Sequence, residues 1–328
     1  MSKPSYENYF SLKILKEPEV DRRGAIILSQ VDYIVEKSPW VIKKFYVIEI
    51  RSWRGLNESK YAHIKLVEDL SLWEQTLKLF PEAICLDIGT ADFVDTDSFR
   101  PLGLNKDYSG IQVSHWSDFK RPELFTRAAG LLPKRKFLKL GHFVDGGSPL
   151  ELEVRNKNIY LAKELGAKID VPYSYVLNNK GFPNTKEIMN QYINSAQIGI
   201  LTTAVEGINR FKMECLSTNI PVIVPADTSY PTKKHINEET GGFFNPTPKD
   251  LARKIEDVIE NIEKYNPRDY VKKITGKSIS LQKLKGALKE ACKIYGEEYS
   301  FDDVDWDGRN QSLIWGKRVF EVLDKYKI

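Results

Sequence analysis

The chain has little cysteine and no large excess of one charge. Its 328 residues include only three cysteines, Cys85, Cys215 and Cys292. This odd number at wide spacing argues against a disulfide scaffold or a thiolate metal site, and a reducing compartment is expected. The 49 lysines and arginines against 45 aspartates and glutamates leave a net charge of +4. That is far short of the excess of an obligate nucleic-acid binder.

Long hydrophobic runs and the commonest catalytic motifs are also missing. No stretch approaches the ~20 apolar residues of a membrane span, and the first residues lack the apolar core of a signal peptide. We therefore expect a cytoplasmic protein without an integral membrane segment. The sequence contains no P-loop, G-x-G-x-x-G, H-E-x-x-H, G-x-S-x-G or C-x-x-C. Their absence argues against kinase, dehydrogenase, metalloprotease and serine hydrolase functions.

The sequence does contain an alternation of short apolar runs and helical stretches. Hydrophobic residues make up 41% and charged residues 29% of the chain, enough for about two folded domains. Short continuous apolar runs are typical of strands covered on both faces. They predict strands at 45–50, 64–67, 83–88, 111–113, 137–140, 169–171, 198–201 and 220–224, and helices at 70–80, 122–132, 150–165, 185–196, 210–218 and 248–265. The alternation favours an α/β protein with open, doubly wound parallel sheets.

Two interruptions divide the chain. Residues 101–110 are rich in Pro, Gly, Asn, Asp and Ser just before a new strand, so we place a domain boundary there. A second break is the acidic stretch at 297–307. The predicted parts are an N-terminal domain, 1–107, a larger domain, 108–295, and a C-terminal segment, 296–328, with a helix able to pack back on the N-terminal domain.

The most informative segment follows the predicted strand that ends at residue 201. Glu206 comes directly after this strand, Gly207 permits a sharp turn, and Asn209 can cap the helix that carries Glu214. Ligands of open parallel sheets bind beyond the carboxyl ends of the strands. The two acids, about 12 Å apart along a helix, suit hydroxyls on different rings, and the helix N-terminus between them suits a phosphate. Sugar, phosphate and ribose in a row indicate a nucleotide-sugar.

The pattern continues beyond Glu214 with a Pro-Val-Ile run at 221–223 and a Thr-Gly-Gly turn at 240–242. In this order the residues resemble the donor-binding half of the retaining GT-B glycosyltransferases of the large group 1 family, over about residues 108–265. The resemblance implies an α/β, GT-B-like fold with two Rossmann-type, doubly wound parallel sheets and an abbreviated N-terminal domain. It also implies a glycosyltransferase that moves a sugar from a nucleotide-diphosphate sugar to an acceptor hydroxyl, with retention of configuration and without a metal or other cofactor.

The same resemblance assigns roles to the residues of this segment. In the family, the second acid binds the ribose hydroxyls and the first contacts the donor sugar, which implies these roles for Glu214 and Glu206. Main-chain groups of Gly207, Ile208 and Asn209 would approach the sugar and the diphosphate. The structural alternative is that Glu214 belongs to an exposed helix face and Glu206 to a loop, and that neither binds a ligand.

A basic pair after the first strand of the donor domain is expected to hold the diphosphate. Lys120 fits the family's lysine position, whereas the arginine position falls on Ser114, a departure from the pattern. His115 and Arg121 are the candidates for the missing charge. For Lys120 and Arg121 the alternative is a solvated helix start. Tyr173, after the third predicted strand of this domain, is expected either to stack on the nucleobase or to pack in the core.

The resemblance gives the acceptor side to domain 1–107 and the nucleotide-sugar to domain 108–295. Asp87, near the end of a predicted strand, is the candidate for orienting the acceptor hydroxyl, although aspartate also favours turns. The sequence does not distinguish UDP-, GDP- and TDP-sugars as donors. It leaves open a glycan, lipid, protein, small molecule or modified DNA base as the acceptor, and it does not indicate an oligomeric state.

Two other functions remain open at this level. Asp95 and Asp97 form a D-x-D of the type that holds a divalent metal in GT-A glycosyltransferases, which would make the transfer metal-dependent. The abbreviated N-terminal domain and the missing arginine also allow a protein that binds a nucleotide-sugar without catalysis.

Overall fold

The computed structural model describes residues 10–50, 59–141, 149–172, 185–308 and 313–327. The chain forms two compact units. The first unit comprises Met1–Phe93 and Lys277–Ile328, and the second comprises Val94–Gly276. In the described ranges no helix is long and apolar enough to cross a membrane. All three cysteines are free, in agreement with the sequence.

The first unit is built on a six-stranded sheet. Its strands lie in the order β12-β1-β2-β3-β4-β5. Their bounds are β1 Ser11–Lys16, β2 Gly24–Leu28, β3 Phe45–Ile50, β4 Ile64–Leu66, β5 Ile84–Leu86 and β12 Ile314–Trp315. Strands β2 to β5 are parallel, whereas β1 pairs antiparallel with both β2 and β12. Four of the six strands, β2 to β5, therefore run parallel to one another as the sequence predicts, and β1 and β12 do not belong to this parallel part.

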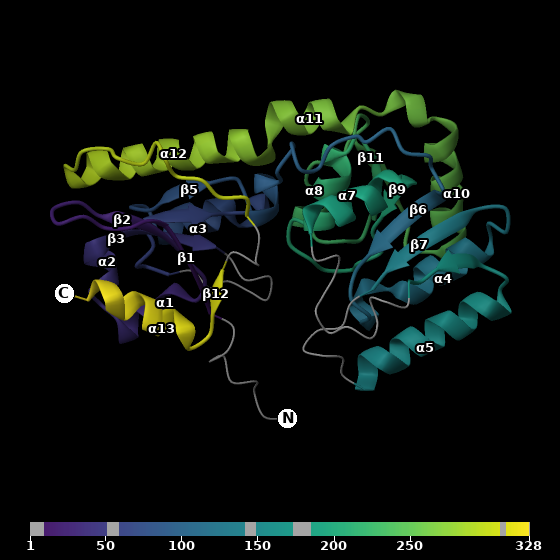
Figure 1. Ribbon diagram of the computed structural model, residues 1–328, viewed down its shortest axis with the longest axis horizontal. Coiled ribbons are helices and arrows are strands. Elements are labelled where there is room, and N and C mark those ends of the chain that lie inside the picture. The colour runs from purple at the N-terminus through teal and green to yellow at the C-terminus, as the bar shows by residue number, and fades with distance from the viewer. Residues whose placement is uncertain (1–9, 51–58, 142–148, 173–184, 309–312, 328) are drawn as a thin grey trace. The chain divides into compact units, whose positions relative to one another are not determined.

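Helices cover both faces of the first sheet. The long helix α12 (Gly276–Tyr295) lies along one face (Figure 1), where Leu284 and Leu288 join a core with Ile27 and Ile48. On the other face, Val31 of α1 (Val31–Lys37) and Val319 of α13 (Arg318–Leu323) pack into a second core. The remaining helices of this unit are α2 Val41–Lys44 and α3 Trp73–Leu79. Burial on both faces explains why these strands are continuously apolar.

The second unit contains a six-stranded, wholly parallel sheet in the order β11-β10-β9-β6-β7-β8. The strands are β6 Tyr108–Val113, β7 Lys136–Leu140, β8 Lys168–Asp170, β9 Ala196–Ile200, β10 Val222–Pro225 and β11 Gly241–Phe244. Numbered along the chain within this unit, the order reads 3-2-1-4-5-6 from β8 to β11. This is the Rossmann order, and its topological switch point lies between β6 and β9.

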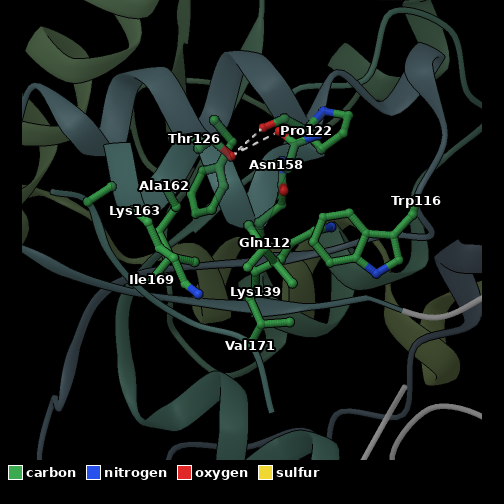
Figure 2. Close-up of a pocket in the computed structure, with 13 residues that line it drawn as sticks. Gln112, Trp116, Pro122, Thr126, Lys139, Asn158, Ala162, Lys163, Ile169 and Val171 are labelled. Atoms are coloured by element: carbon green, nitrogen blue, oxygen red, sulfur yellow. Dashed lines mark hydrogen bonds between the residues drawn. The ribbon is translucent and has the colours of Figure 1, made fainter. Parts of the chain in front are cut away.

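The helices of the second unit sandwich its sheet. They are α4 Pro122–Gly130, α5 Pro149–Glu164, α7 Lys186–Asn194, α8 Arg210–Ser217, α9 Tyr230–Lys233, α10 Pro248–Glu260 and α11 Pro267–Ile274. Phe125 of α4 and Ile255 of α10 share a core with Phe137 and Ile198 of the sheet. Helix α8 contacts β9 and β10, and α11 packs on α8. A cavity of about 250 Å³ lies between α4, α5 and the strands β6 to β8 (Figure 2).

All eight strands and six helices expected from the sequence are present within a few residues of the predicted bounds. Thr247 caps α10 as its position predicts, since its hydroxyl accepts a hydrogen bond from the Asp250 amide at 3.2 Å. The sequence did not indicate β1, β2, β11 or the 20-residue helix α12. Helix α12 does have buried apolar residues at helical spacing, among them Leu281, Leu284, Leu288 and Ala291, so the sequence contains a signal for it that the prediction missed.

The compact units begin and end at other residues than the predicted domains. The segment placed at the end of the N-terminal domain belongs to the second unit, because Asn194 of α7 accepts from the Leu102 amide and from the Lys106 ammonium. The Ser217 hydroxyl also donates to the Phe99 carbonyl. Residues 277–295, which the predicted boundaries place in the second domain, form most of α12 and pack instead in the core of the first unit through residues such as Leu284.

Candidate functional site

The switch point of the second sheet is where this unit can hold a ligand. Strands β6 and β9 are neighbours in the sheet, but the chain leaves them toward opposite faces: α4 follows β6 on one side and α8 follows β9 on the other. The two connections therefore separate at the carboxyl ends of these strands and leave a crevice between them. Residues 114–121 and 201–209 form this part of the molecule.

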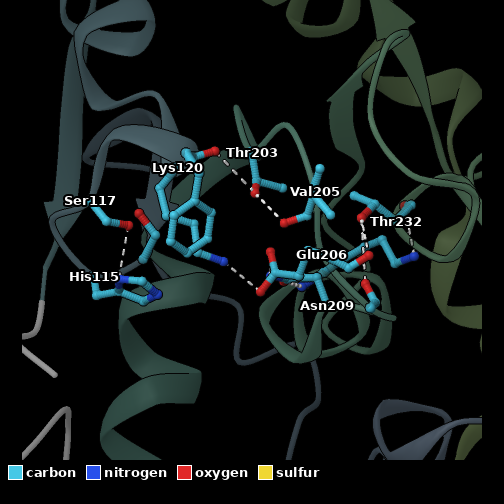
Figure 3. Close-up of polar contacts among 12 residues, drawn as sticks. His115, Ser117, Lys120, Thr203, Val205, Glu206, Asn209 and Thr232 are labelled. Carbon is cyan, nitrogen blue, oxygen red and sulfur yellow. Dashed lines mark hydrogen bonds and ion pairs between the residues drawn. The ribbon is translucent and has the colours of Figure 1, made fainter. Parts of the chain in front are cut away.

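Lys120, Glu206 and Asn209 meet at this point (Figure 3). The Lys120 ammonium lies 2.6 Å from one carboxylate oxygen of Glu206, and the Asn209 side-chain amide donates to the other oxygen at 2.8 Å. The side chain of Lys120 is 7% exposed and that of Glu206 is 24% exposed. The predicted lysine and the predicted first acid thus form one charged cluster, with the carboxylate as its more accessible member.

The backbone turns hold this cluster in place. Lys120 ends a short 3-10 helix, Asp118–Lys120, and its carbonyl accepts from the Thr202 hydroxyl at 2.6 Å. Arg121 then takes a left-handed conformation with φ of 50° directly before Pro122. This conformation is uncommon for a residue with a side chain. It reverses the chain sharply, so the side chains of Lys120 and Arg121 reach different partners.

Glu206 is fixed through its backbone as well as its side chain. Its amide donates to the Ser229 hydroxyl at 3.0 Å, and its carbonyl accepts from the Thr232 hydroxyl at 3.2 Å. Beneath this loop Lys212 is completely buried and donates to the carbonyls of Pro231, Thr232 and Lys234. All three ammonium protons therefore have acceptors, and α8 is bound firmly to the segment that carries α9.

Asn209 has the capping role that the sequence predicts. Its side-chain oxygen accepts from the Lys212 amide at 2.8 Å and so caps α8. A small cavity of about 10 Å³ lies among Ser114, Lys120, Glu206 and Asn209, with room for about one water. The N-terminal end of α8, with its positive dipole, and Lys120 both belong to the switch point, a combination that suits an anion.

A second lysine, absent from the expectations, stands behind this cavity. Lys139 of β7 is 2% exposed and donates to the carbonyl and to the hydroxyl of Ser114, at 3.0 and 2.6 Å. It lines the larger cavity with Gln112 and Trp116 (Figure 2). Burial, and then the charge of Lys120, hold the pKa of Lys139 well below its ordinary value. The sequence signal that could have identified Lys139 is its position inside an otherwise apolar predicted strand.

Gly141 lets the aromatic wall of this region approach β7. A Cβ built on Gly141 would lie 2.1 Å from the indole nitrogen of Trp116, so a side chain at this position would displace the ring. Trp116 is 2% exposed, and the Lys139 ammonium lies 4.9 Å from its ring centroid. The lysine is thus held between an aromatic face and the two oxygens of Ser114.

Two of the predicted basic residues have other partners. Arg121 makes two hydrogen bonds to the carboxylate of Asp227, at 2.9 and 2.8 Å. The His115 ring lies 3.1 Å from the Ser117 hydroxyl and 3.7 Å from a carboxylate oxygen of Glu151. Burial, Lys120 and Lys139 lower the pKa of His115 to about 4, so this ring is neutral near pH 7. These partners of Arg121 and His115 lie outside the pair of Lys120 and Glu206.

The other predicted residues lie elsewhere. Glu214 is on α8 and only 5% exposed; it does not line the small cavity. Gly207 and the buried Ile208 lie in the loop between Glu206 and Asn209. Asp87 belongs to the first unit, and Tyr173 lies outside the described residues.

Asp95 and Asp97 do not form a metal site in the part of the chain that the structure covers. One Asp95 carboxylate oxygen accepts from the amides of Asp97 and Ser98, and the other accepts from the Ser98 hydroxyl and pairs with Lys186 at 2.8 Å. Burial opposes these contacts, but they lower the pKa of Asp95 below its ordinary value. No group of three potential metal ligands occurs among the described residues. The carboxylate of Asp95 closes a turn.

The sequence matches no protein-family profile and no curated protein, whereas the fold has clear structural neighbours. HepE of Anabaena in complex with UDP is 12% identical, has a TM-score of 0.62, and the match covers 80% of this chain and 77% of HepE. For sucrose-phosphate synthase from Thermosynechococcus elongatus the values are 16%, 0.59, 80% and 71%. For a glycosyltransferase from Rickettsia africae they are 16%, 0.57, 80% and 80%.

At these identities the likeness establishes the fold. Two Rossmann-like α/β units, each with a six-stranded sheet, match the GT-B architecture that the sequence predicts. The same finding disfavours the metal-dependent GT-A alternative built on Asp95 and Asp97, because that alternative needs a different architecture and Asp95 has other partners.

Proposed function

We propose that this chain is a glycosyltransferase that moves a sugar from a nucleotide-diphosphate sugar to an acceptor hydroxyl. The observation that carries the proposal is the cluster of Lys120, Glu206 and Asn209 at the switch point of a Rossmann-ordered sheet. The fold is shared with glycosyltransferases, among them HepE, which was solved with UDP and also with UDP and glucose. The cation and the helix N-terminus suit the diphosphate of such a donor, and the carboxylate suits its sugar hydroxyls.

The main task of the site is to stabilise the leaving group. During transfer the bond between C1 of the sugar and the diphosphate oxygen breaks, and its electron pair stays on the diphosphate. The Lys120 ammonium and the first amides of α8 are fixed before the reaction and can meet this charge. The acceptor oxygen forms the new bond to C1 and gives up its proton to the departing diphosphate, which holds the electron pair of the broken bond. Because protein groups supply the positive charge, we propose that transfer requires no metal ion.

Glu206 and Lys120 are expected to change partners when the donor binds. Without a ligand, each satisfies the other at 2.6 Å. A diphosphate competes for Lys120, and the half-exposed carboxylate of Glu206 is then released toward the sugar hydroxyls while Asn209 keeps its hold on the second oxygen. This exchange orients the sugar only when the diphosphate is in place.

The finer assignments of the sequence resemblance complete the proposal. They are retention of configuration, binding of ribose hydroxyls by Glu214, approach of the main chain at Gly207 and Ile208, stacking of Tyr173 on the base, and orientation of the acceptor by Asp87. Support for Glu214 is its place on α8, the helix that begins at the switch point. Because Glu214 is only 5% exposed, a bound ribose would have to lie close to α8.

Thermal stabilisation by UDP-, GDP- and TDP-sugars identifies the donor, because a ligand that binds the folded state raises its apparent stability. With that donor, Lys120→Met should lower kcat/KM by about 10²- to 10³-fold. Lys134→Met, which changes an exposed lysine of the same unit, is the matched control and should leave kcat/KM unchanged. Activity should persist in the presence of a chelator.

The two acids can be separated by their effects. Glu214→Ala should weaken donor binding, whereas Glu206→Ala should mainly lower turnover. Normal transfer by both variants would remove the proposal. A protein that binds the donor but releases no free nucleotide with any acceptor would be a nucleotide-sugar-binding protein rather than an enzyme.

A further inference from the structure

Lys139 is a buried cation that the proposed mechanism has not used. It lies on β7, in register with Gln112 of the neighbouring strand β6. A charged side chain facing the interior of a sheet needs strong compensation, because burial removes its hydration. Within the described ranges its ammonium reaches the two oxygens of Ser114 and the face of Trp116. Among the described residues no carboxylate pairs with it.

Lys139 does not serve as a hydrogen-bond donor to the buried side chain of its strand neighbour, Gln112. The side-chain oxygen of Gln112 is buried and has no partner among the described residues, although Gln112 uses its amide nitrogen to donate to Thr202 at 2.7 Å. Lys139 bypasses this acceptor and extends toward the carboxyl end of β6, where Ser114 begins the loop to Lys120. Its direction is toward the candidate site.

The hydrogen bond between Lys139 and Ser114 has a defined polarity. An ammonium can only donate, so the Ser114 oxygen accepts, and the Ser114 hydroxyl proton is left to donate to another group. Ser114 also lines the small cavity with Lys120 and Glu206. The arrangement therefore presents a hydroxyl donor, polarised from behind by a cation, to whatever occupies the cavity side of Ser114.

We propose that Lys139 provides the second positive charge at the diphosphate site and acts through Ser114, at the position where an arginine is missing from the motif. Lys139 is thus a positioning residue, and its role rests on the proposed function. Lys120 is balanced by Glu206, whereas no carboxylate among the described residues pairs with Lys139, so the charge that Lys139 carries when protonated is available to a bound anion.

Nucleotide binding should consequently be linked to a proton. Burial, and then the charge of Lys120, disfavour the charge on Lys139 and lower its pKa, whereas the negative charge of a bound diphosphate favours the protonated form. The pKa of Lys139 therefore rises on binding, a proton is taken up, and affinity increases as the pH falls between the free and bound pKa values. Among the residues that the structure describes, the other charged or titratable groups near it are Lys120, His115 and Lys163; the lining residues on α4 and β8 are uncharged.

The test compares affinities for the tightest-binding of UDP, GDP and TDP. Lys139→Met, which keeps the length of the side chain, should weaken binding by about tenfold to a hundredfold, with little change for the corresponding nucleoside. Lys139→Arg should retain most of the affinity. Lys163→Met, in the same cavity but without contact to Ser114, is the matched control and should bind as the unaltered protein does.

Calorimetry in two buffers of different ionisation enthalpy measures the proton uptake. Uptake should be present in the unaltered protein and in His115→Gln, and it should be lost in Lys139→Met. Ser114→Ala should weaken binding in the same sense, and it carries the test if Lys139→Met fails to fold. Unchanged affinity and unchanged uptake in Ser114→Ala or in a folded Lys139→Met overturn the inference.

The inference and the proposed function fail in different ways. If no nucleoside diphosphate binds the unaltered protein, both are wrong. If the nucleotide binds and Lys120→Met weakens binding while Lys139→Met does not, the proposed function stands and only the role of Lys139 is lost.

Discussion

Each unit of the molecule contains a lysine paired with a glutamate at its parallel sheet, and the two pairs are built differently. In the first unit Lys65 and Glu49 face each other in register on β4 and β3, 2.5 Å apart, with side chains 3% and 7% exposed. In the second unit Lys120 and Glu206 come from two loops and lie 2.6 Å apart, with the carboxylate 24% exposed.

The first pair has further partners within the part of the protein that the structure describes. The Ser59 amide donates to Glu49, and the Lys65 ammonium also donates to the Ser59 carbonyl at 2.6 Å and lies 4.0 Å from the ring centroid of Phe80. The Ser59 hydroxyl in turn donates to Asp32. A buried pair with every contact made inside the protein stabilises one arrangement and resists change.

The second pair is open on one side and sits at a switch point, so its partners can be exchanged for those of a ligand. The same two residue types therefore have a structural role in one unit and a proposed binding role in the other. Geometry and access separate the two roles, because the chemistry of the side chains is identical.

The largest effect should come from breaking the closed pair. Glu49→Ala leaves the Lys65 ammonium buried without its carboxylate, and we expect a loss of about 3–5 kcal/mol in unfolding free energy. Hydrogen exchange of the β3 and β4 amides measures it in the first unit, with the β6 and β9 amides as the internal control. An unaltered exchange rate in β3 and β4 would mean that the pair is not structural.

Opening the other pair should affect activity more than stability. Glu206→Gln keeps the shape of the side chain, and we expect turnover to fall about a hundredfold while unfolding free energy changes by less than about 2 kcal/mol. Steady-state kinetics with the identified donor and urea unfolding give the two values. The comparison fails if stability falls as far as in Glu49→Ala and turnover does not.

The two units should also differ in their response to pH. Burial, against the attraction of Lys65, raises the pKa of Glu49 from 4.5 to about 7. The folded state then holds a proton that the unfolded state has lost, so this residue makes the first unit less stable as pH rises from about 4.5 to about 7. Burial and Arg23 lower the pKa of His63 to about 4, which acts in the opposite direction.

The contribution of Glu49 is therefore isolated by subtraction. Hydrogen exchange in β3 and β4 across this pH range measures the stability of the unaltered protein and of Glu49→Gln. The difference between the two should change with pH, because the side-chain amide in Glu49→Gln does not titrate. A constant difference would show that Glu49 stays ionised beside Lys65.

A smaller effect is expected from the residue that links Glu206 to α8. Asn209→Ala removes a helix cap, at about 1 kcal/mol, and one of the two contacts of the Glu206 carboxylate, so turnover should fall about tenfold. Thr247→Ala removes the cap of α10 in the same unit and is the matched control. Equal turnover in both variants would show that Asn209 is only a cap.

The smallest effect is expected at the ion pair of Arg121 and Asp227, whose side chains are 28% and 41% exposed. Arg121→Ala should change unfolding free energy by about 0–1 kcal/mol and donor affinity by less than about twofold, because the guanidinium is held away from the cluster. Isothermal titration with the donor decides this. A large loss of affinity would restore Arg121 as the missing cation.

Local features were within reach of the sequence. The strands of the second unit are apolar because both faces are covered, so their positions were predicted within a few residues. Asn209 was predicted as a cap because a cap depends on a polar side chain three residues before the amide from which it accepts, and Thr247 follows the same local rule. The strand β7 was also predicted, but its lysine was passed over as part of an apolar run.

Contacts between distant residues were decided by the tertiary structure. Glu206 binds Lys120 because β6 and β9 are neighbours, and Arg121 turns to Asp227 because a left-handed residue reverses the chain. Lys139 reaches Ser114 because β7 lies beside β6. The amino-acid sequence by itself determined which segments form strands and helices and where α8 begins. Only the folded sheet decided which charges meet, because strand order depends on packing across the whole unit and not on any local pattern.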